Sequence, residues 1–503
     1  MRTTVREKLR RSKRRLERRL ENRPGEERES PMFTATDVHY ELSSRARGIA
    51  CGGVGALMMV ARASGLIGDI DSRLKLLRRH LPYHESDHVL NVALNIAAGG
   101  SRIEHIELRR NDEAFLDALG AGRIPDPTTG GDFCRRFEGP DVLDLMDAFN
   151  AARLRVWRQQ PAGFFERAII DIDGTLVGTG AECKAGIDIA YDGTWGYHPL
   201  VVSLANTSEP PFLADRPGNR PSHDEAWVYE EKAIALCRRA GFREVLLRGD
   251  TDFSQTRRLD RWDDAGHVRF IFGLDAMPNL VALPEGAYGY LERPEPPIGT
   301  VPRERPERHK AKVVEAREFE TIGTLEEMVA EFDYRPTACD RAYRVVVLRK
   351  RLARDKGQMR LFEEYRYFFF ITNDRERPAE AVVLDANRRC NQENLVAQLK
   401  GGVHALATPV DDLVSNWAYM VMASLAWSLK AWSALLLPIS PRHAERHEAQ
   451  KRALLAMEFR TFRAAMIEMP CQIIRGGRRL IYRILSWNPW RGAFLMRLGA
   501  SSE

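Results

Sequence analysis

The segment FFERAIIDIDGT, residues 164–175, joins an apolar run to two acids and a turn. Its apolar and β-branched residues predict a buried strand, and Gly174 and Thr175 predict that the chain turns directly afterwards. Such a strand carries Asp171 and Asp173 to its end. Carboxylates in that place commonly bind a metal ion or act as a nucleophile. The segment therefore predicts an active site built on a strand.

The composition is that of a soluble globular protein. The chain has 503 residues, of which 44% are hydrophobic and 9% aromatic, so it can fill roughly three domains. The formal net charge is +6, and the first thirty residues alone carry twelve Arg or Lys against six Glu. We expect residues 1–32 to form a basic arm, which is either a solvated tail or a contact to nucleic acid. The arm has no apolar core, so it is not a signal peptide.

The cysteines and the longest apolar run bear on the compartment. Seven cysteines are scattered and form no CxxC pair, which predicts reduced thiols in the cytoplasm, without a disulfide framework or a zinc knuckle. Residues 413–429 are uncharged over seventeen positions, near the lower length limit of a membrane span. Lys430 follows directly and no second such run exists, so we predict a buried core helix and no membrane partner.

The order of elements after residue 164 can be read from the hydrophobic pattern. Three strands are expected first, RAIIDID, AGIDIAYDG and YHPLVVSLAN, with DGTWG as a turn between the second and third. A helix over DEAWVYEEKAIALCRRAGF should stop at Gly241, and the strand REVLLRGD should then end in Asp250. VRFIFGL predicts a further strand. The pattern is antiparallel at first, and two of its strands end in acids.

Two enzyme classes share an acid-bearing turn of this kind. The haloacid dehalogenase-like phosphatases have a DxDGT motif whose first acid is the nucleophile, which here would be Asp171. That class has a parallel, doubly wound sheet, so a helical crossover should soon follow the motif. Antiparallel-looking strands follow instead, and RGDTDF has its acids two residues too close for the late acidic pair. The phosphatase remains an alternative.

The ribonuclease H-like enzymes fit the order of elements better. Their sheet begins with an acid-bearing strand and two antiparallel strands, and a helix, a second acid-bearing strand and a late acidic helix follow. Here the corresponding acids are Asp173, Asp250 and Glu393. Two divalent cations about 3.5–4 Å apart need several carboxylates that converge from separate elements. These three acids are therefore the predicted catalytic and metal-binding residues.

The segment DANRRCNQENLVAQLKGG, residues 385–402, predicts one helix with a polar start and a double-glycine end. At about 100° per residue, Arg389, Glu393 and Lys400 lie on one face of such a helix. One carboxylate could then bind metal while the two cations contact phosphates. The alternative is an ordinary ion pair on a solvated helix. The spacing resembles the R(3)E(6)K signature of insertion-sequence transposases that have a DDE site.

The resemblance is closest to the thirteen-eighty family of insertion-sequence transposases, over roughly residues 45–480. It is carried by GGVGALMMVARASGL, the DIDGT turn, GYHPLVV, LLRGDTDF, FFFITN and SNWAYMVMASLAWSL. Asp250 is preferred over Asp252 because it directly follows the strand. The family has a tyrosine three positions before the arginine, where this chain has Ala386. This departure bears on how a DNA end phosphate is held.

The resemblance implies an α/β fold, a ribonuclease H-like mixed sheet flanked by helices, with a mostly β insertion and an α-helical N-terminal region. The expected domains are a basic arm (1–32), a helical DNA-binding region (33–160), the first part of the core (161–276), the β insertion (277–375), the second part of the core (376–437) and a C-terminal region (438–503).

The function that the resemblance implies is DNA transposition. The protein would bind terminal inverted repeats, hydrolyse phosphodiester bonds and join the 3′ ends to target DNA, with two Mg²⁺ or Mn²⁺ ions. Its partner would be double-stranded DNA, and joining two ends would take at least a homodimer. A catalytically inactive DNA-binding relative is an alternative that Ala386 favours.

A basic hairpin loop could line the DNA path. YRVVVLRK and LFEEYRYFFFITN predict two strands around RLARDKGQMR. The cations are Arg349, Lys350, Arg351, Arg354, Lys356 and Arg360. A solvated turn is the alternative interpretation.

One zinc-like string is declined. HESDH, residues 84–88, matches the HExxH pattern of zinc proteases, which needs both histidines on one helix and a third ligand nearby. Pro82 and an expected helix cap at Ser86 place His84 outside the helix.

Overall fold

The computed structural model describes residues 48–494 apart from 81, 182, 276–288, 291–319, 357–358, 477–478 and 486–488, together with scattered positions between 7 and 18. The chain divides into two compact units. A helical unit comprises Met1–Gln160, Thr179–Gly186 and Ala397–Glu503, and a sheet unit comprises Pro161–Gly178 and Ile187–Val396. Most of the predicted basic arm lies outside the described residues.

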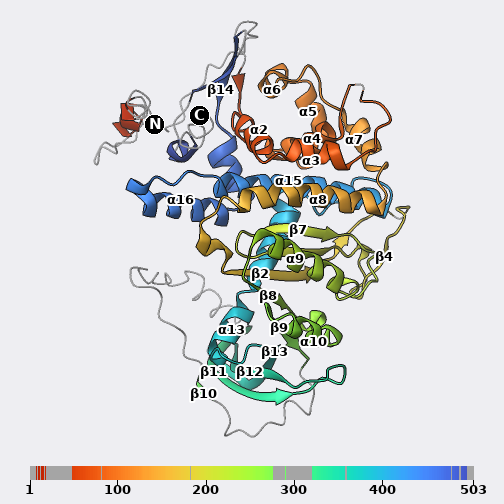
Figure 1. The fold of residues 1–503 in the computed structure, drawn as a ribbon, viewed down its shortest axis with the longest axis vertical. Helices are drawn as coiled ribbons and strands as arrows, with labels where there is room; N and C mark the ends of the chain where they lie inside the picture. The colour runs from red at the N-terminus through yellow and green to blue at the C-terminus, as the bar shows by residue number, and fades with distance from the viewer. Residues whose placement is uncertain are drawn as a thin grey trace. The chain divides into compact units, whose positions relative to one another are not determined.

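The helical unit is built around two long helices, α8 and α15, which run side by side (Figure 1). Its helices are α2 (Val54–Ala63), α3 (Leu66–Arg73), α4 (Glu85–Ala97), α5 (Ile106–Arg110), α6 (Glu113–Leu119), α7 (Pro127–Cys134), α8 (Gly139–Trp157), α15 (Leu413–Leu435), α16 (Ala444–Ala456) and α17 (Phe459–Phe462). Its strands β1 (Gly48–Ile49), β14 (Cys471–Gly476) and β15 (Arg479–Ile484) form one small sheet.

Helix α15 contains the apolar run that the sequence predicts as a core helix, and it is buried along nearly its whole length. Asp412 caps it by accepting a hydrogen bond of 2.9 Å from the backbone N–H of Ser415. The prediction of a buried core helix is confirmed. Among the described residues, no helix combines the length and the apolar character that crossing a membrane requires.

The sheet unit contains one nine-stranded sheet in the order β10-β11-β12-β13-β9-β8-β2-β6-β7. Its strands are β2 (Arg167–Gly174), β6 (Leu200–Leu204), β7 (Glu209–Ala214), β8 (Glu244–Gly249), β9 (Val268–Leu274), β10 (Gly289–Tyr290), β11 (Glu320–Tyr334), β12 (Tyr343–Lys356) and β13 (Met359–Thr372). Three two- or three-residue strands, β3 (Val177–Gly178), β4 (Asp188–Ile189) and β5 (Trp195–Tyr197), form a separate sheet.

Strand direction within the large sheet defines the fold class. β2 pairs with β6 antiparallel and with β8 parallel, and β8 pairs with β9 parallel. The five strands β7-β6-β2-β8-β9 thus run in the order third, second, first, fourth and fifth along the chain, with helix α9 (Ala226–Ala240) between the third and the fourth. This is a ribonuclease H-like mixed sheet, and the predicted fold class is confirmed.

Helices pack on this sheet through apolar side chains. Helix α13 (Ala379–Asn387) contributes Val382 and Val383 to a buried cluster with Leu246 of β8, Ile271 of β9 and Val346 of β12. Helix α9 packs against β2, β6, β7 and β8, and α10 (Thr256–Asp264) packs against β9. Burying these aliphatic side chains contributes roughly 1.5–3 kcal/mol each. The strand ends that carry the acids are therefore fixed by the core.

One predicted strand is wrong and one strand is missed, while the predicted YHPLVVSLAN contains β6. Residues 185–193 do not form the second strand of the large sheet, since they contribute only the two-residue β4 to the small sheet. The second strand is β6 and the third is β7, which has the sequence EPPFLA. Two prolines argue against a strand in general, but β7 is the outermost strand, where missing N–H donors are tolerated.

The predicted hairpin is present, with longer strands than expected. β12 and β13 pair antiparallel from Arg344↔Thr372 to Lys356↔Met359. Arg349 and Lys350 lie in a strand as predicted, and Arg351, which falls in the predicted loop, is a strand residue as well. β13 also pairs with β9, so the hairpin extends the large sheet. The side chains of Arg354, Lys356 and Arg360 lie outside the described part.

The expected cap of α4 is also wrong. The helix begins at Glu85 and His84 is its N-cap residue, while Ser86 lies inside the first turn. The Ser86 hydroxyl and backbone N–H both donate to the Asp71 carboxylate at 2.9 Å. The Ser86 side chain is thus engaged with another helix and cannot cap its own.

Candidate active site

Asp173 lies near the end of β2, where the sequence places it. Its side chain is 18% exposed, and its backbone faces Val201 of β6 in the register. The next residue must be a glycine for steric reasons, because a Cβ atom at Gly174 would lie 2.7 Å from Nε2 of His198. The His198 ring is held by a hydrogen bond of 2.8 Å between its Nδ1 and the carbonyl oxygen of Arg220. Asp173 therefore projects from a tightly packed strand end.

Asp250 directly follows β8, the parallel neighbour of β2. Its Oδ1 accepts a hydrogen bond of 3.1 Å from the backbone N–H of Asp252, which fixes the turn. The turn lies close to β9, because a Cβ at Gly273 would be 2.8 Å from the backbone nitrogen of Thr251. Asp250 is 37% exposed and Asp252 is exposed. The side chain of Asp250 lies near Arg389, the same arginine that lies near Asp173.

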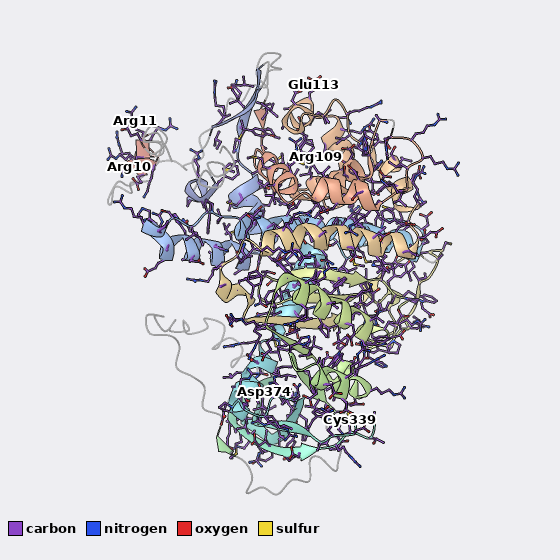
Figure 2. The ribbon with its side chains drawn as sticks, viewed as in Figure 1. Arg10, Arg11, Arg109, Glu113, Cys339 and Asp374 are labelled. Carbon is purple, nitrogen blue, oxygen red and sulfur yellow. The ribbon has the colours of Figure 1, made fainter. Side chains whose placement is uncertain are left out.

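A turn after β13 leads into α13 and then to α14, the helix that carries Glu393. Asp374, labelled in Figure 2, accepts hydrogen bonds of 3.1 Å from the backbone N–H groups of Glu376 and Arg377. Arg377 in turn forms ion pairs with Asp374 and with Asp385 of α13. Arg388 also pairs with Asp385, at 3.1 Å. This network, in which Arg388 is exposed and the other charges are buried or half-buried, holds the C-terminal end of α13.

The predicted single helix over residues 385–402 is wrong. α13 ends at Asn387, α14 (Cys390–Ala397) begins after a turn, and a π-helical turn spans Gln398–Gly402. Arg389 therefore lies in the turn before α14, and Glu393 lies in the first turn of α14. Lys400 lies in the π-helical turn and belongs to the helical unit. The regular 100° spacing does not apply across these breaks.

Gln392 attaches α14 to the sheet beside the first acid. Its Nε2 donates to the carbonyl oxygen of Val201 at 3.0 Å, and its Oε1 accepts from the hydroxyl of Ser203. Val201 is the register partner of Asp173 on β2. Gln392 is buried, so the exposed Glu393 beside it is placed relative to Asp173 by these two bonds. Sequence reasoning missed Gln392, because a single buried amide leaves no periodic pattern.

Arg389 brings the acids into one electrostatic group. Its Nη1 lies 3.5 Å from Oδ2 of Asp173, and its Nη2 lies 3.7 Å from Oδ2 of Asp250. The Nη1 atom is buried and has no hydrogen-bond partner among the described residues. Arg389, in the turn before α14, therefore lies beside both Asp173 at the end of β2 and Asp250 after β8.

Burial and neighbouring charges shift the pKa values of Asp173 and Asp250. The pKa of Asp173 is raised to about 6, mainly by burial and also by the charges of Asp250 and Glu393, while Arg389 opposes the rise. Burial also raises the pKa of Asp250, against the effect of Arg389. The charges of both other acids therefore act on Asp173. Perturbed carboxylates in one place are typical of functional sites.

Asp171, the candidate nucleophile of the phosphatase alternative, does not belong to this group. It is 1% exposed and accepts two hydrogen bonds of 2.7 Å from Arg248, from Nε to Oδ1 and from Nη2 to Oδ2. Arg248 also donates to the carbonyl oxygen of Asp385 at 2.7 Å. A carboxylate held on both oxygens inside the sheet cannot attack a substrate, so the phosphatase interpretation is wrong.

The hairpin cations are paired with acids on the neighbouring strand. Lys350 lies 3.0 Å from Glu327 and Arg351 lies 3.7 Å from Glu326, both on β11. Arg349 donates to the Met328 sulfur at 3.0 Å, and its guanidinium carbon is 5.1 Å from the ring centre of Tyr365. The sequence could not show this neutralisation, because the partners are about 25 residues away along the chain.

The declined HESDH string has an unexpected neighbour. Ligand atoms of His80, His84 and Glu85 lie within 4.8 Å of one another, and this is the one such group of three or more among the described residues. The Glu85 carboxylate is buried and accepts from Leu77 N–H at 3.1 Å, besides contacting His80 Nε2 at 3.0 Å. His88 instead stacks on Phe133. The HExxH geometry is therefore not formed.

Asp173, Asp250 and Glu393 do not form such a group, so at least one pair of their carboxylates lies more than 4.8 Å apart.

The carboxylate oxygens of Asp173, Asp250 and Glu393 are suitable ligands for a hard divalent cation. Mg²⁺ prefers carboxylate oxygens, and several carboxylates from separate elements can share two such ions. Asp173, Asp250 and Glu393 are the side chains that could hold the cations.

Fold and site together define a ribonuclease H-like enzyme with a carboxylate centre. A family model described as Transposase DDE domain group 1 matches residues 49–499, and the chain belongs to this family. It is thus an enzyme of DNA cleavage and strand transfer, from a family that generally uses divalent metals.

Other comparisons add little. A cryo-EM structure of the piggyBac transposase synaptic complex with hairpin DNA is similar at 10% identity, over 83% of each chain, with a TM-score of 0.35. Nothing about the site follows from a likeness at that level. No curated protein matches the sequence.

Proposed function

We propose that the protein is the transposase of an insertion sequence of the thirteen-eighty family, acting in the cytoplasm on terminal inverted repeats. The observation that carries the site assignment is the position of Arg389, whose two terminal nitrogens face Asp173 and Asp250 while Glu393 lies on the helix that follows. The catalytic residues would be Asp173, Asp250 and Glu393.

These acids would hold two Mg²⁺ or Mn²⁺ ions, which when bound activate the attacking oxygen and stabilise the leaving one. The strand ends would fix Asp173 and Asp250 at the spacing of neighbouring strands, roughly 4.8 Å. Gln392 would hold α14 so that Glu393 faces the other two acids. Because Asp173 and Asp250 lie on hydrogen-bonded parallel strands, their backbones would stay in place through the reaction.

Double-stranded DNA would be the partner, first as terminal repeats and then as target. Arg389 and Lys400 would contact phosphates beside the site. Lys350 and Arg351, which are 25% and 40% exposed, would extend the path along β12 together with Arg349, Arg354 and Lys356, and Arg360 of β13 would join them. Replacing one cation that binds a phosphate should flatten the plot of log affinity against log salt by about 0.9. Two DNA ends would require at least a homodimer.

The test is cleavage of DNA that carries the inverted repeats flanking the coding region. With Mg²⁺, Asp173→Asn, Asp250→Asn and Glu393→Gln should each lower the cleavage rate by at least about a thousandfold. Asp252→Asn is the matched control, because Asp252 is an exposed acid two residues from Asp250. A site variant that folds and still cuts at the wild-type rate refutes the assignment.

The alternative of an inactive DNA-binding relative rests on Ala386. This residue is half-buried and packs against the apolar cluster under α13. An inactive relative would bind the same repeats with Mg²⁺ present and leave them uncut. The wild-type protein in the cleavage assay therefore distinguishes the two proposals directly.

A further inference from the structure

Arg389 is held at the site by charge and not by hydrogen bonds. Its distances to Oδ2 of Asp173 and Oδ2 of Asp250 are 3.5 and 3.7 Å, longer than the usual limit of about 3.2 Å for an N–H···O bond. Its Nη1 is buried without a hydrogen-bond partner among the described residues. A buried donor without an acceptor is unfavourable, so this placement is readily given up for a better acceptor.

The oxygens that face Arg389 are those that a cation bridging the two acids would use. A Mg²⁺ ion binds oxygen at about 2.0–2.1 Å, so two oxygens on one ion are at most about 4.2 Å apart, with the ion between them. The guanidinium lies 3.5 and 3.7 Å from one oxygen each of Asp173 and Asp250, so a cation held by those oxygens would meet its positive charge. Arginine and cation therefore compete for these oxygens.

Resting on the function proposed above, we propose that Arg389 is the competitor that a divalent cation displaces, and that the displaced guanidinium then binds a DNA phosphate. A phosphate offers two oxygens that can accept short, charge-assisted hydrogen bonds, which Asp173 and Asp250 do not accept from Arg389 here. Arg389 is thus a positioning residue that is exchanged between the carboxylates and the DNA.

The surroundings of Arg389 permit this exchange. Arg389 lies in the turn between α13 and α14, outside regular helix on both sides. Arg388 and Arg377 both form ion pairs with Asp385 of α13. This other nearby acid therefore already has cationic partners and does not need Arg389. Arg389 can therefore rotate away without breaking a hydrogen bond to a described side chain.

The exchange makes metal and DNA binding favour each other. A cation at the acids releases Arg389 for a phosphate, and a phosphate that holds Arg389 leaves the acids free for a cation. By thermodynamic reciprocity the metal raises DNA affinity by the same factor by which DNA raises metal affinity. The acids would thus be fully assembled with cations when DNA is present.

The test measures metal affinity without any reaction. Mn²⁺ binding to the full-length protein, followed by electron paramagnetic resonance at pH 7.5 without DNA, should be about tenfold tighter for Arg389→Gln than for the wild type, because a competing positive charge is removed. Arg388→Gln is the matched control and should bind Mn²⁺ as the wild type does. Arg389→Lys keeps the charge but cannot span both acids, so its affinity should lie between these two.

A second measurement follows DNA affinity, where Arg389→Gln should lose the effect of a divalent cation. The affinity for a fluorescent 30-base-pair duplex of random sequence should rise several-fold on adding Ca²⁺ in the wild type and in Arg388→Gln, and should stay unchanged in Arg389→Gln. A merely structural role for Arg389 would weaken metal and DNA binding together. Thermal unfolding of each variant establishes that it is folded.

The outcomes separate this inference from the proposed function. If Arg389→Gln and Arg389→Lys bind Mn²⁺ no more tightly than the wild type, the competition is refuted while the carboxylate site stands. If Mn²⁺ binding to the wild type is unaffected by Asp173→Asn, the carboxylate site itself is refuted, and the inference falls with it.

Discussion

Asp171 and Arg248 form a fully buried ion pair between the two central strands, with both carboxylate oxygens bonded at 2.7 Å. In the register Asp171 of β2 lies opposite Arg248 of β8. The pair lies two residues before Asp173 and two before Asp250, so it joins the two strands just beneath the acids. Its role is therefore to align the strand ends.

Removing one partner of this pair should destabilise the protein strongly. Arg248→Met leaves a buried carboxylate without its cation, and we expect a loss of about 3–5 kcal/mol in the free energy of unfolding. The double variant Asp171→Leu with Arg248→Met removes both charges and should recover most of that loss. Urea unfolding of the three proteins measures this. A double variant as unstable as the single one would contradict a charge-pair origin.

DNA cleavage should depend on pH through Asp173. Burial raises its pKa to about 6, so the carboxylate is charged above that pH and becomes neutral below it. A neutral carboxyl is a poor metal ligand, so at limiting Mg²⁺ the single-turnover rate should be level above pH 7 and fall about tenfold per pH unit below 6. Raising Mg²⁺ should move the midpoint to lower pH, because cation and proton compete. A rate that is flat between pH 5 and 8 would count against the assignment.

Replacing Gln392 should affect the rate of DNA cleavage more than the free energy of unfolding. Gln392→Leu keeps the size of the side chain but removes its bonds to Val201 and Ser203, at a cost of about 1–2 kcal/mol in the free energy of unfolding. Because α14 then loses its attachment beside Asp173, cleavage should slow by about tenfold or more. Asn391→Leu is the control, since Asn391 is exposed on the same helix. Equal rates for both variants would show that Gln392 does not position Glu393.

Glu230 should make the protein less stable at high pH. It is fully buried on α9, neither carboxylate oxygen has a hydrogen-bond partner among the described residues, and burial raises its pKa from 4.5 to about 8. The folded state holds this proton and the unfolded state does not, so stability falls as pH rises from about 4.5 to 8, by on the order of 4 kcal/mol.

Glu230→Gln should remove that fall. Urea unfolding between pH 5 and 9 should give a flatter stability profile for the variant, with the largest gain over the wild type above pH 8. At pH 5 the two proteins should differ little. Parallel profiles over the whole range would mean that Glu230 is not protonated in the fold.

The acids at the strand ends could be predicted from the sequence, because apolar runs that stop at an acid have a clear local pattern. Asp173 and Asp250 both lie where that pattern places them. The helix after residue 385 could not be predicted in detail. Its break at Arg388 and its π-helical turn at Gln398–Gly402 follow from tertiary packing, such as the Gln398 side chain accepting from Phe459 N–H at 2.9 Å.

Long-range pairs account for the other differences. Residues 185–193 alternate like a core strand, yet the third strand of the large sheet is β7, whose residues are all buried. The sequence pattern shows the cations of β12 but not that β11 brings Glu326 and Glu327 opposite them. Arg248, the partner of Asp171, lies 77 residues further along the chain. Single-sequence patterns contain no information on such partners.

The two prolines of β7 bear on how copies of this protein can assemble. β7 is the outermost strand at its end of the large sheet, and an outermost strand ordinarily invites lateral pairing with a strand of another molecule. Pro210 and Pro211 remove two consecutive amide donors and interrupt the ladder opposite Ser203. Association by sheet extension is therefore blocked at this end. If a second copy is needed to bring two DNA ends together, it has to be recruited through some other surface.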